Sequence, residues 1–262
     1  MLTPAEYRLI NGHDIEAVPA CLYRAKSNSH ARALAQADWL IRDKLTGTYL
    51  GTYHREKLQP FRRVQNTRNL EEAFHELLVA QSMQGLRRNT DDASIILESL
   101  GIDAIHYSDT HDLNITSEPF ILEYAGKDRY QRPLWLELRT KNAWFRMRHV
   151  AKLQSVFLEP ISGYRSCLYQ KGIFDRKLAK GQTVEQILKV NAAPGFSEHH
   201  SGHAIDIGTP SEPAAEESFE ATNAFDWLCE HAGQFGFKLS YPRDNLHGIN
   251  YEPWHWCWHD NN

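Results

Sequence analysis

The sequence has little of what would assign it to a specialised class of protein. It contains only four cysteines, Cys21, Cys167, Cys229 and Cys257, and none of them form a CxxC motif. Scattered thiols fit a reducing cytosol better than a disulfide framework. No segment has 18 consecutive apolar residues, and the N-terminus MLTPAEYRLINGHDIEAV lacks the basic and apolar parts of a signal peptide. We therefore expect no membrane partner and a cytoplasmic protein, or a periplasmic one whose signal peptide has been removed.

The sequence also lacks a large excess of charge of either sign. The 29 Lys and Arg residues nearly balance the 33 Asp and Glu residues, which gives a net charge of -4, and there is no run of like charges. This argues against a nucleic-acid partner, because such partners require a basic groove. The hydrophobic share of 42% is that of a folded protein with a buried core. The oligomeric state is left open by the sequence.

The first part of the chain reads as helical. Apolar residues recur at helical spacing in three segments, ARALAQADWLIRDKL, LEEAFHELLVAQSMQGL and DDASIILESLG. The polar, turn-prone stretch SDTHDLNITSEP at residues 108–119 follows. We expect a mostly helical N-terminal region of unknown role over residues 1–115, which carries no group of chemically active side chains.

The second part mixes strands and helices. FILEYAG and FKLSYP are typical of strands, while NAWFRMRHVAKLQ and FEATNAFDWLCEHAGQFG each present one apolar helical face. Thr183 and Gln186 have the spacing of a capping box at the start of a short helix. This pattern predicts an α+β domain over residues 116–262.

The stretch 197-SEHHSGHAIDIG-208 gathers the first candidate ligands. In an extended HAIDIG segment, Asp206 shares its face only with small residues, which leaves room for a metal ion beside its carboxylate. Gly202 would allow the preceding loop to bend so that His199 returns toward the same point. The alternative is a solvated polar loop that is rich in histidine by chance.

The stretch 251-YEPWHWCWH-259 supplies two more groups. Pro253 excludes a helix that would bring Glu252 and His255 together, and in a regular strand the two would face opposite sides. They can serve one site only if the chain kinks at Pro253 or if Glu252 reaches in from the strand end. The alternative is a buried, tryptophan-rich edge with no chemistry.

Together, His199, Asp206 and His255 make a three-ligand set that leaves a fourth position of a zinc tetrahedron for water, as catalytic zinc sites do. Glu252 would then be the general base for that water. In 161-ISGYRSCLYQ-170, Arg165 follows a turn and could stabilise an oxyanion or hold a substrate carboxylate, although such an arginine is more often in a surface ion pair.

These three pieces resemble the VanY-type D-Ala-D-Ala carboxypeptidases, a branch of the lysostaphin/D-Ala-D-Ala/hedgehog-like zinc peptidases. The family pattern is SGYRS followed by Gln, then S-x-H-x-x-G-x-A-x-D, then E-P-W-H. The matching residues are Ser162 to Ser166 with Gln170, then Ser197, His199, Gly202, Ala204 and Asp206, then Glu252 to His255. The resemblance extends over roughly residues 120–262 and implies an antiparallel sheet flanked by helices, as in hedgehog/D-Ala-D-Ala peptidases.

The resemblance also implies roles for individual residues. His199, Asp206 and His255 would bind Zn²⁺, Glu252 would be the catalytic base and Arg165 would stabilise the transition state. Substrate contacts would come from Ser197, Gln170 and Tyr164. Cys257 stands where many relatives carry a basic residue, and His203 stands where Arg or Gln is common. We expect the remaining nearby histidines to lie outside the ligand set: His200, His203, His247 and His259.

The implied function is removal of a C-terminal D-Ala from peptidoglycan stem peptides. An L,D-carboxypeptidase acting on tetrapeptides during wall recycling is slightly favoured, because a cytoplasmic enzyme that cut pentapeptides would destroy wall precursors. A D,D-carboxypeptidase acting on D-Ala-D-Ala pentapeptides is the first alternative. A peptidoglycan endopeptidase and a non-catalytic module that binds wall peptides are the others.

Overall fold

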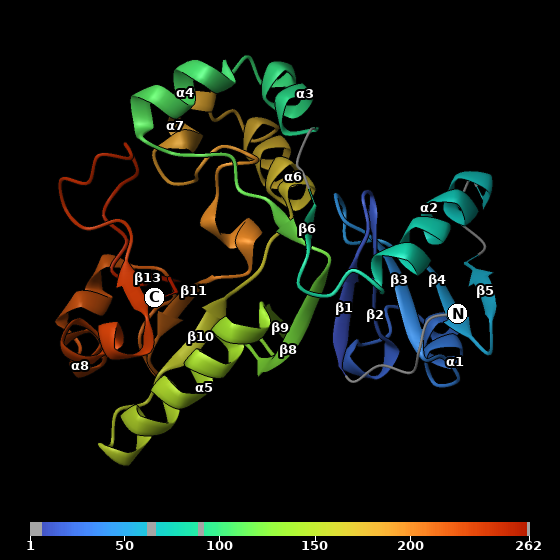
Figure 1. Cartoon of the computed structure of the whole chain (residues 1–262), viewed down its shortest axis with the longest axis horizontal. Coiled ribbons are helices and arrows are strands. Elements are labelled where there is room, and N and C mark those ends of the chain that lie inside the picture. The colour runs from blue at the N-terminus through green and yellow to red at the C-terminus, as the bar shows by residue number, and fades with distance from the viewer. Residues whose placement is uncertain (1–6, 62–66, 89–91, 261–262) are drawn as a thin grey trace. The chain divides into compact units, whose positions relative to one another are not determined.

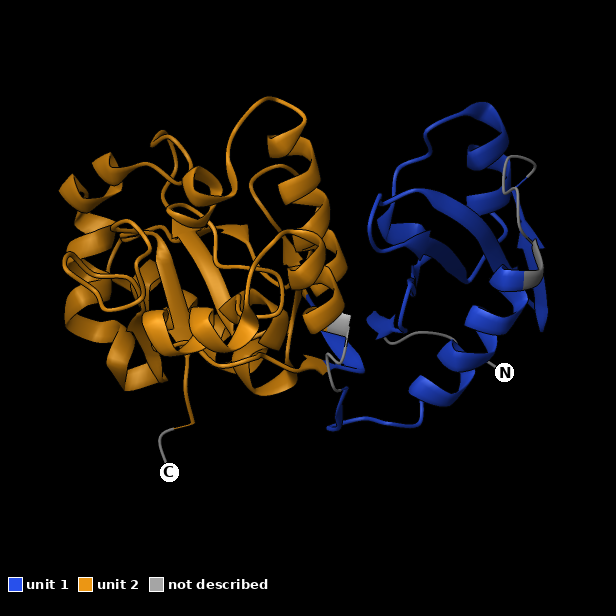
Figure 2. Cartoon of the chain, turned by 90° about the horizontal axis from the view of Figure 1, so that it is seen from above, with its two compact units in different colours: residues 1–88, 119–124 blue, residues 89–118, 125–262 orange. Residues whose placement is uncertain are grey.

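The computed structural model describes residues 7–61, 67–88 and 92–260. The chain divides into two compact units, of which unit 1 comprises residues 1–88 and 119–124 and unit 2 comprises residues 89–118 and 125–262 (Figure 2). Residues 89–115 therefore group with the later part of the chain, although the sequence placed them in the N-terminal region. The reason is that Leu97 and Tyr107 are buried in a small core with Ala193 and Phe196.

Unit 1 is built on an antiparallel sheet. Its strand order is β5-β4-β3-β2-β1-β8, in which the first part of β8 adds to the edge of β1. Helix α2 contributes Leu70, Phe74 and Leu77 to the core under this sheet. The elements of unit 1 are β1 (Arg8–Asn11), β2 (Ile15–Pro19), η1 (Ala20–Leu22), α1 (Asn28–Leu34), β3 (Trp39–Asp43), β4 (Tyr49–His54), β5 (Lys57–Pro60), α2 (Thr67–Ala80) and β6 (Arg87–Arg88) (Figure 1).

The expectation of a mostly helical N-terminal region is wrong for residues 8–60. The segment expected to be one helix, ARALAQADWLIRDKL, ends its helix at Leu34 and continues as strand β3. Trp39, Leu40 and Ile41 are buried between the neighbouring strands β2 and β4. A short apolar run of this kind does not distinguish a buried strand from a helix by its periodicity, and pairing on both sides decides the outcome. The helices expected near residues 70–80 and 92–99 are present.

Unit 2 contains the predicted mixture of helices and antiparallel sheet. Its sheet has the order β10-β11-β13-β12, and each neighbouring pair is antiparallel. The strands of unit 2 are β7 (Glu118–Pro119), β8 (Ile121–Lys127), β9 (Pro133–Leu136), β10 (Glu159–Ser162), β11 (Ala204–Gly208), β12 (Phe237–Leu239) and β13 (His255–Trp258), of which β7 and β8 also extend into unit 1. The α+β class expected from the sequence is confirmed.

Helices cover one face of this sheet. Ile205, Ile207 and Trp256 point into a core that also holds Trp144 of α5 and Leu228 of α8. The helices of unit 2 are α3 (Asp92–Ser99), α4 (Ala104–His111), α5 (Leu138–Leu153), α6 (Cys167–Leu178), α7 (Val184–Leu188), η2 (Glu198–Ser201), η3 (Glu217–Ala221), α8 (Asn223–His231) and η4 (Ala232–Phe235). Because strand residues alternate, the neighbours of the core residues point to the opposite face, where Asp206 and His255 lie.

Local signals that the sequence predicted are present in unit 2. Thr183 and Gln186 form the expected capping box at the start of α7. Gly236 ends the helical segment after α8 with a φ of +85°, a left-handed conformation that glycine adopts without strain. The capping box marks the start of α7, and the turn at Gly236 comes directly before β12.

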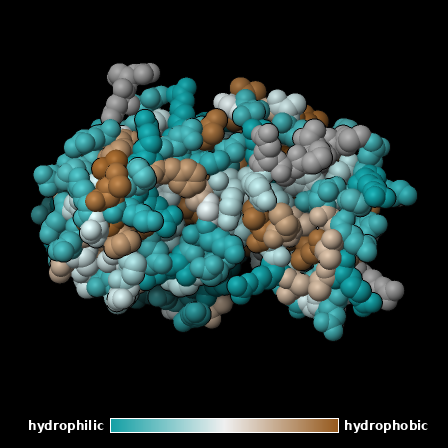
Figure 3. Space-filling model, turned by 90° about the horizontal axis from the view of Figure 1, so that it is seen from below, coloured by the Kyte–Doolittle hydropathy of each residue, from teal (hydrophilic) through white to brown (hydrophobic). Residues whose placement is uncertain are grey.

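None of the helices in the described residues combines the length and the apolar composition that crossing a bilayer requires. Hydrophilic residues cover most of the face drawn in Figure 3, and apolar residues occur there in small groups. Scattered groups of this kind are normal on a protein surface.

Candidate functional site

Three potential ligand atoms lie close together on the face of the unit 2 sheet that is opposite the helix-covered core. The Oδ1 atom of Asp206 lies 3.3 Å from Nε2 of His199 and 3.1 Å from Nδ1 of His255. Asp206 and His255 are direct partners on the adjacent strands β11 and β13, and all three side chains are buried. The ligand atoms around a tetrahedral zinc ion lie roughly 3.3–3.7 Å apart. The three residues that the sequence singled out are therefore brought together at a spacing that suits one metal ion.

The turn before β11 presents His199 to this point. His199 lies in η2, and Gly202 ends that turn with a φ of +74°, so the chain bends as its glycine predicted. The ring nitrogen Nδ1 of His199 lies 2.7 Å from the carbonyl oxygen of Gly163. A carbonyl only accepts, so Nδ1 carries the proton and Nε2 keeps its lone pair for a metal. The main chain of the SGYRS segment thus fixes the tautomer of one ligand.

A carboxylate holds the other histidine. The Nε2 atom of His255 donates to Oε2 of Glu198 at 2.8 Å, which leaves Nδ1 of the same ring directed at Asp206. Partners of this kind on the far nitrogen orient histidine ligands and raise their basicity. Glu198 was not singled out from the sequence. Its only signal there is its place between Ser197 and His199.

The electrostatics of the three ligands are strongly coupled. Burial and the positive charge of Arg165 lower the pKa of His199 to about 4, so this ring is neutral at neutral pH. Burial also opposes the charge on His255, but hydrogen bonds to Asp206 and Glu198 outweigh it and raise the pKa of His255 to about 10. Burial also disfavours the charged form of Asp206. The two histidines outweigh this effect and hold the pKa of Asp206 well below its usual range.

Glu252 reaches the site from the strand end, which is one of the two routes left open by the sequence. A turn in which the His255 amide donates to the Glu252 carbonyl at 3.1 Å comes just before β13. The turn places Oε2 of Glu252 3.9 Å from Nδ1 of His255. Burial, with the charges of Asp206 and Glu198 adding to it, raises the pKa of Glu252 to about 7. A carboxyl group that titrates near neutrality is suited to general base catalysis.

A pocket of about 380 Å³ opens beside these residues. Its walls include Arg165, Ser197 and Glu252 together with the three ligands. The Nε atom of Arg165 is buried and has no hydrogen-bond partner among the described residues. A buried guanidinium N–H group without a partner is suited to an anionic group of a ligand. The remaining lining residues are Val190, Asn191, Ala192, Ala215, Glu216, Glu217, Tyr241, Ile249, Asn250, Tyr251 and Trp254.

Two of the residues expected to contact substrate do not line this pocket. Gln170 is fully buried in α6, and its Nε2 atom donates to the Ala192 carbonyl at 2.9 Å. The Tyr164 hydroxyl donates to Oε2 of Glu118 at 2.7 Å. In this structure Gln170 supports a wall, since Ala192 itself lines the pocket, whereas Tyr164 is held by Glu118, which is not among the lining residues.

The histidines expected to lie outside the ligand set have other contacts. Nδ1 of His203 lies 2.6 Å from the Thr140 hydroxyl, on the side away from Asp206. The ring of His200 bridges the chain, with Nδ1 2.7 Å from the Arg165 carbonyl and Nε2 accepting from the Gly195 amide. His247 lies against the His111 carbonyl. One further aromatic residue was missed from the sequence: Tyr241 lines the pocket, and its ring centre lies 4.7 Å from that of His255.

Comparison with known proteins relates the second part of the chain to a peptidase family. Residues 133–261 match the family model VanY, D-alanyl-D-alanine carboxypeptidase. YodJ of Bacillus subtilis (strain 168), named as a carboxypeptidase, is 34% identical over 148 residues, which cover 55% of this chain and 52% of YodJ. The chain therefore spans about half the length of this relative. The resemblance of the three motifs to the VanY family is confirmed.

Two further similarities carry more specific names. The bifunctional D-Ala-D-Ala dipeptidase and carboxypeptidase VanXYC of Enterococcus gallinarum is 28% identical over 153 residues, which cover 55% of this chain and 77% of that protein. A solved structure of a VanY D,D-pentapeptidase mutant in complex with Zn(II) is 26% identical, with a TM-score of 0.41, and the match covers 57% of this chain and 80% of that one.

Proposed function

We propose that this chain, which belongs through residues 133–261 to the VanY family of D-alanyl-D-alanine carboxypeptidases, is a zinc carboxypeptidase that removes a C-terminal D-Ala from peptidoglycan stem peptides. The observation that carries the proposal is the convergence of His199, Asp206 and His255, with Glu252 3.9 Å from His255. Two imidazoles and one carboxylate form a ligand set of catalytic zinc sites, which keep a fourth position for water or substrate. In this proposal residues 116–262 hold the catalytic machinery, and the role of residues 1–115 is undefined.

The roles of the residues follow from their placement. When bound, zinc would polarise the scissile carbonyl and lower the pKa of water. Glu252 takes the proton from the attacking water and transfers it to the leaving amine, which its pKa near 7 allows. Arg165 stabilises the negative charge that develops on the carbonyl oxygen or holds the substrate carboxylate. Ser197, at the pocket wall, contacts the peptide, while Gln170 holds the wall at Ala192 and Tyr164, next to Arg165 in the chain, is fixed by Glu118.

The acidic wall of the pocket supports the preference for tetrapeptides. An L,D-carboxypeptidase must accept a diamino acid just before the scissile bond, whereas a D,D-carboxypeptidase accepts D-Ala at that place. Glu216 and Glu217 both line the pocket, and Glu217 lies 3.5 Å from Arg243. Glu216 is thus the carboxylate better placed to attract the side-chain amine of lysine or diaminopimelate. A cytoplasmic location, where recycled tetrapeptides are met, is part of this proposal.

Mass spectrometry of products tests the proposal directly. The zinc-loaded protein is incubated with an equimolar mixture of muropeptides that carry tetrapeptide and pentapeptide stems. Loss of one alanine from the tetrapeptide is expected. Loss from the pentapeptide alone would identify a D,D-carboxypeptidase, and cleavage inside the stem or cross-bridge would identify an endopeptidase. Binding of both stems without cleavage would identify a non-catalytic module.

The Glu216→Gln variant tests the specificity. Removing an exposed counter-charge is expected to lower the rate of tetrapeptide cleavage about two- to fivefold, because such ion pairs contribute about 0.5–1 kcal/mol. The pentapeptide, which has D-Ala at that place, should be unaffected. Glu230→Gln, on α8 outside the pocket, is the matched control. Equal effects of Glu216→Gln on both peptides would contradict the assigned contact.

A further inference from the structure

Strand β13 carries more ligating side chains than the catalytic site uses. Its sequence with one residue on each side, 254-WHWCWH-259, alternates between tryptophan and a residue with a metal-binding atom. Trp256 is in the helix-covered core, and Trp254 and Trp258 pack against that core. Because side chains alternate along a strand, His255, Cys257 and His259 share the opposite face. His255 belongs to the first site, which leaves Cys257 and His259 without a role.

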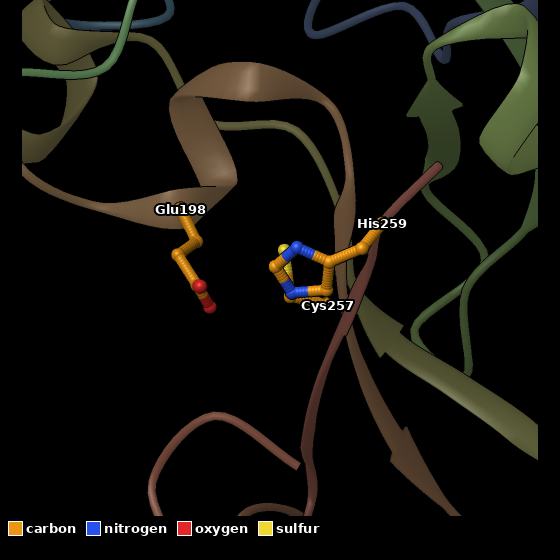
Figure 4. Close-up of side chains that lie close together, drawn as sticks. All are labelled: Glu198, Cys257 and His259. Carbon is orange, nitrogen blue, oxygen red and sulfur yellow. The ribbon is translucent and has the colours of Figure 1, made fainter. Parts of the chain in front are cut away.

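Glu198 completes a group with these two residues. It comes from η2, whereas Cys257 and His259 come from β13 and the residue that follows it (Figure 4). One ligand atom from each of the three side chains lies within 4.8 Å of the others. Cys257 is buried and His259 is exposed, so the group is anchored below the surface and reachable from solvent.

The chemistry of the group suits a thiophilic divalent cation. A thiolate and a carboxylate together carry two negative charges, which one dication neutralises, and the imidazole adds a neutral nitrogen. Cysteine, histidine and carboxylate are all ligands of Zn²⁺, at about 2.3, 2.0–2.1 and 2.0–2.2 Å. Separations of up to 4.8 Å exceed those in a tetrahedral zinc site by roughly 1 Å, a change that side-chain rotation of the exposed His259 can supply.

The cross-strand neighbours of Cys257 are one small residue and one exposed residue. The partner of Cys257 on β11 is Ala204, whose methyl group is the smallest side chain that a strand position can carry apart from glycine. The partner on β12 is Lys238, which is exposed, so its ammonium group can extend into solvent away from a bound cation.

We propose that Glu198, Cys257 and His259 form a second metal site, for Zn²⁺ or a similarly thiophilic divalent cation, beside the His199/Asp206/His255 site. The two sites share Glu198. Its Oε2 atom accepts from His255, and a carboxylate oxygen of the same residue lies within 4.8 Å of ligand atoms of Cys257 and His259. The second site does not depend on the proposed peptidase activity, because none of its ligands reacts with substrate.

Cobalt titration of the metal-free protein tests the proposal, because only the second site contains a thiolate. Co²⁺ bound by His199, Asp206 and His255 gives visible ligand-field bands alone, whereas Co²⁺ bound by Cys257 adds a near-ultraviolet thiolate-to-cobalt charge-transfer band. We expect two equivalents to bind the wild-type protein, with the charge-transfer band present. Cys257→Ser should remove the band and one equivalent, and His259→Ala should weaken the binding that produces the band about tenfold or more.

Two controls separate this site from other thiols and from the catalytic centre. Cys229→Ser removes an exposed thiol outside the group and should keep the band. His199→Ala removes a ligand of the first site only, so it should also keep the band even if the proposed peptidase function fails. A wild-type protein without the band, or a band that persists in Cys257→Ser, would overturn the proposal. If Cys257→Ser does not fold, His259→Ala at its exposed position decides the matter, and an unchanged titration would count against the site.

Discussion

His255 and Glu198 are joined by a 2.8 Å hydrogen bond in which the imidazole Nε2–H donates to the carboxylate. This contact fixes which nitrogen of His255 is directed at Asp206. It also links the metal centre to the short turn that carries His199, since Glu198 and His199 are neighbours in η2. Glu198 therefore positions a ligand without belonging to the His199/Asp206/His255 set.

Removing this carboxylate should weaken metal binding. We expect Glu198→Ala to lower the zinc affinity of the first site about 10- to 100-fold, as loss of an outer-shell partner of a histidine ligand commonly does. The measurement is a chelator competition titration, performed in a Cys257→Ser background so that one site alone is observed. Glu230→Gln serves as the surface control. An unchanged affinity in Glu198→Ala would show that His255 needs no carboxylate partner.

Glu252 should be needed for turnover and not for metal binding. Its carboxylate is at the site edge, 3.9 Å from a ligand atom of His255, and it is outside the converging set of three. We expect Glu252→Gln to reduce kcat about 10²- to 10⁴-fold, the usual contribution of a general base. Zinc content by mass spectrometry should remain at the level of the parent protein. Full activity in Glu252→Gln would remove the proposed role.

The pH dependence should follow Glu252. Burial is the main cause that raises its pKa to about 7, and the charges of His255 and Arg165 act in the opposite direction. The base works only when deprotonated, so kcat/KM should fall as the pH decreases through this pKa. A bound dication favours the carboxylate and places this acidic limb at or below pH 7.

The Arg165→Gln variant tests whether the pKa of Glu252 sets the acidic limb of the pH profile. Arg165 lowers the pKa of Glu252, so removing its charge should move the acidic limb of kcat/KM to higher pH. The position of the limb is read separately from the rate at its plateau, which also reports on substrate binding. A limb that stays in place, or one that moves to lower pH, would show that Glu252 does not control the profile.

The sequence was sufficient to predict the cluster of His199, Asp206 and His255, because local patterns place these residues and their neighbours. The alternation of HAIDIG puts Asp206 on a strand face, and Gly202 adopts the left-handed turn that its position suggested. Pro253 excluded a helix, and Glu252 does reach in from the strand end. The α+β class could also be predicted, since the helices and strands of unit 2 have clear periodicity.

What could not be predicted depends on contacts between distant segments. Strand β3 forms because β2 and β4 pair with it on both sides, and its own residues fit a helix equally well. The role of Glu198 requires His255, which is 57 residues away. Gln170 matches the family motif, yet its side chain is turned to the Ala192 carbonyl inside the wall. No local sequence pattern predicts this orientation of the Gln170 side chain.

Gly163 packs closely against Leu134 and Trp135, and its carbonyl oxygen contacts the ring of His199. Gly163→Ala should therefore disturb both this packing and the metal site. A Cβ atom at this position would lie 2.7 Å from a Leu134 side-chain carbon and 2.9 Å from the Trp135 carbonyl oxygen. Relieving such overlap costs about 1–3 kcal/mol and requires the main chain to shift. The Gly163 carbonyl would shift with it and loosen its 2.7 Å contact with Nδ1 of His199. We therefore expect lower thermal stability of the metal-free protein together with weaker zinc binding.

Gly233→Ala is the matched control, because a Cβ there meets no atom within 4 Å. Loss of stability with unchanged zinc affinity would show that the Gly163 carbonyl is not what orients His199.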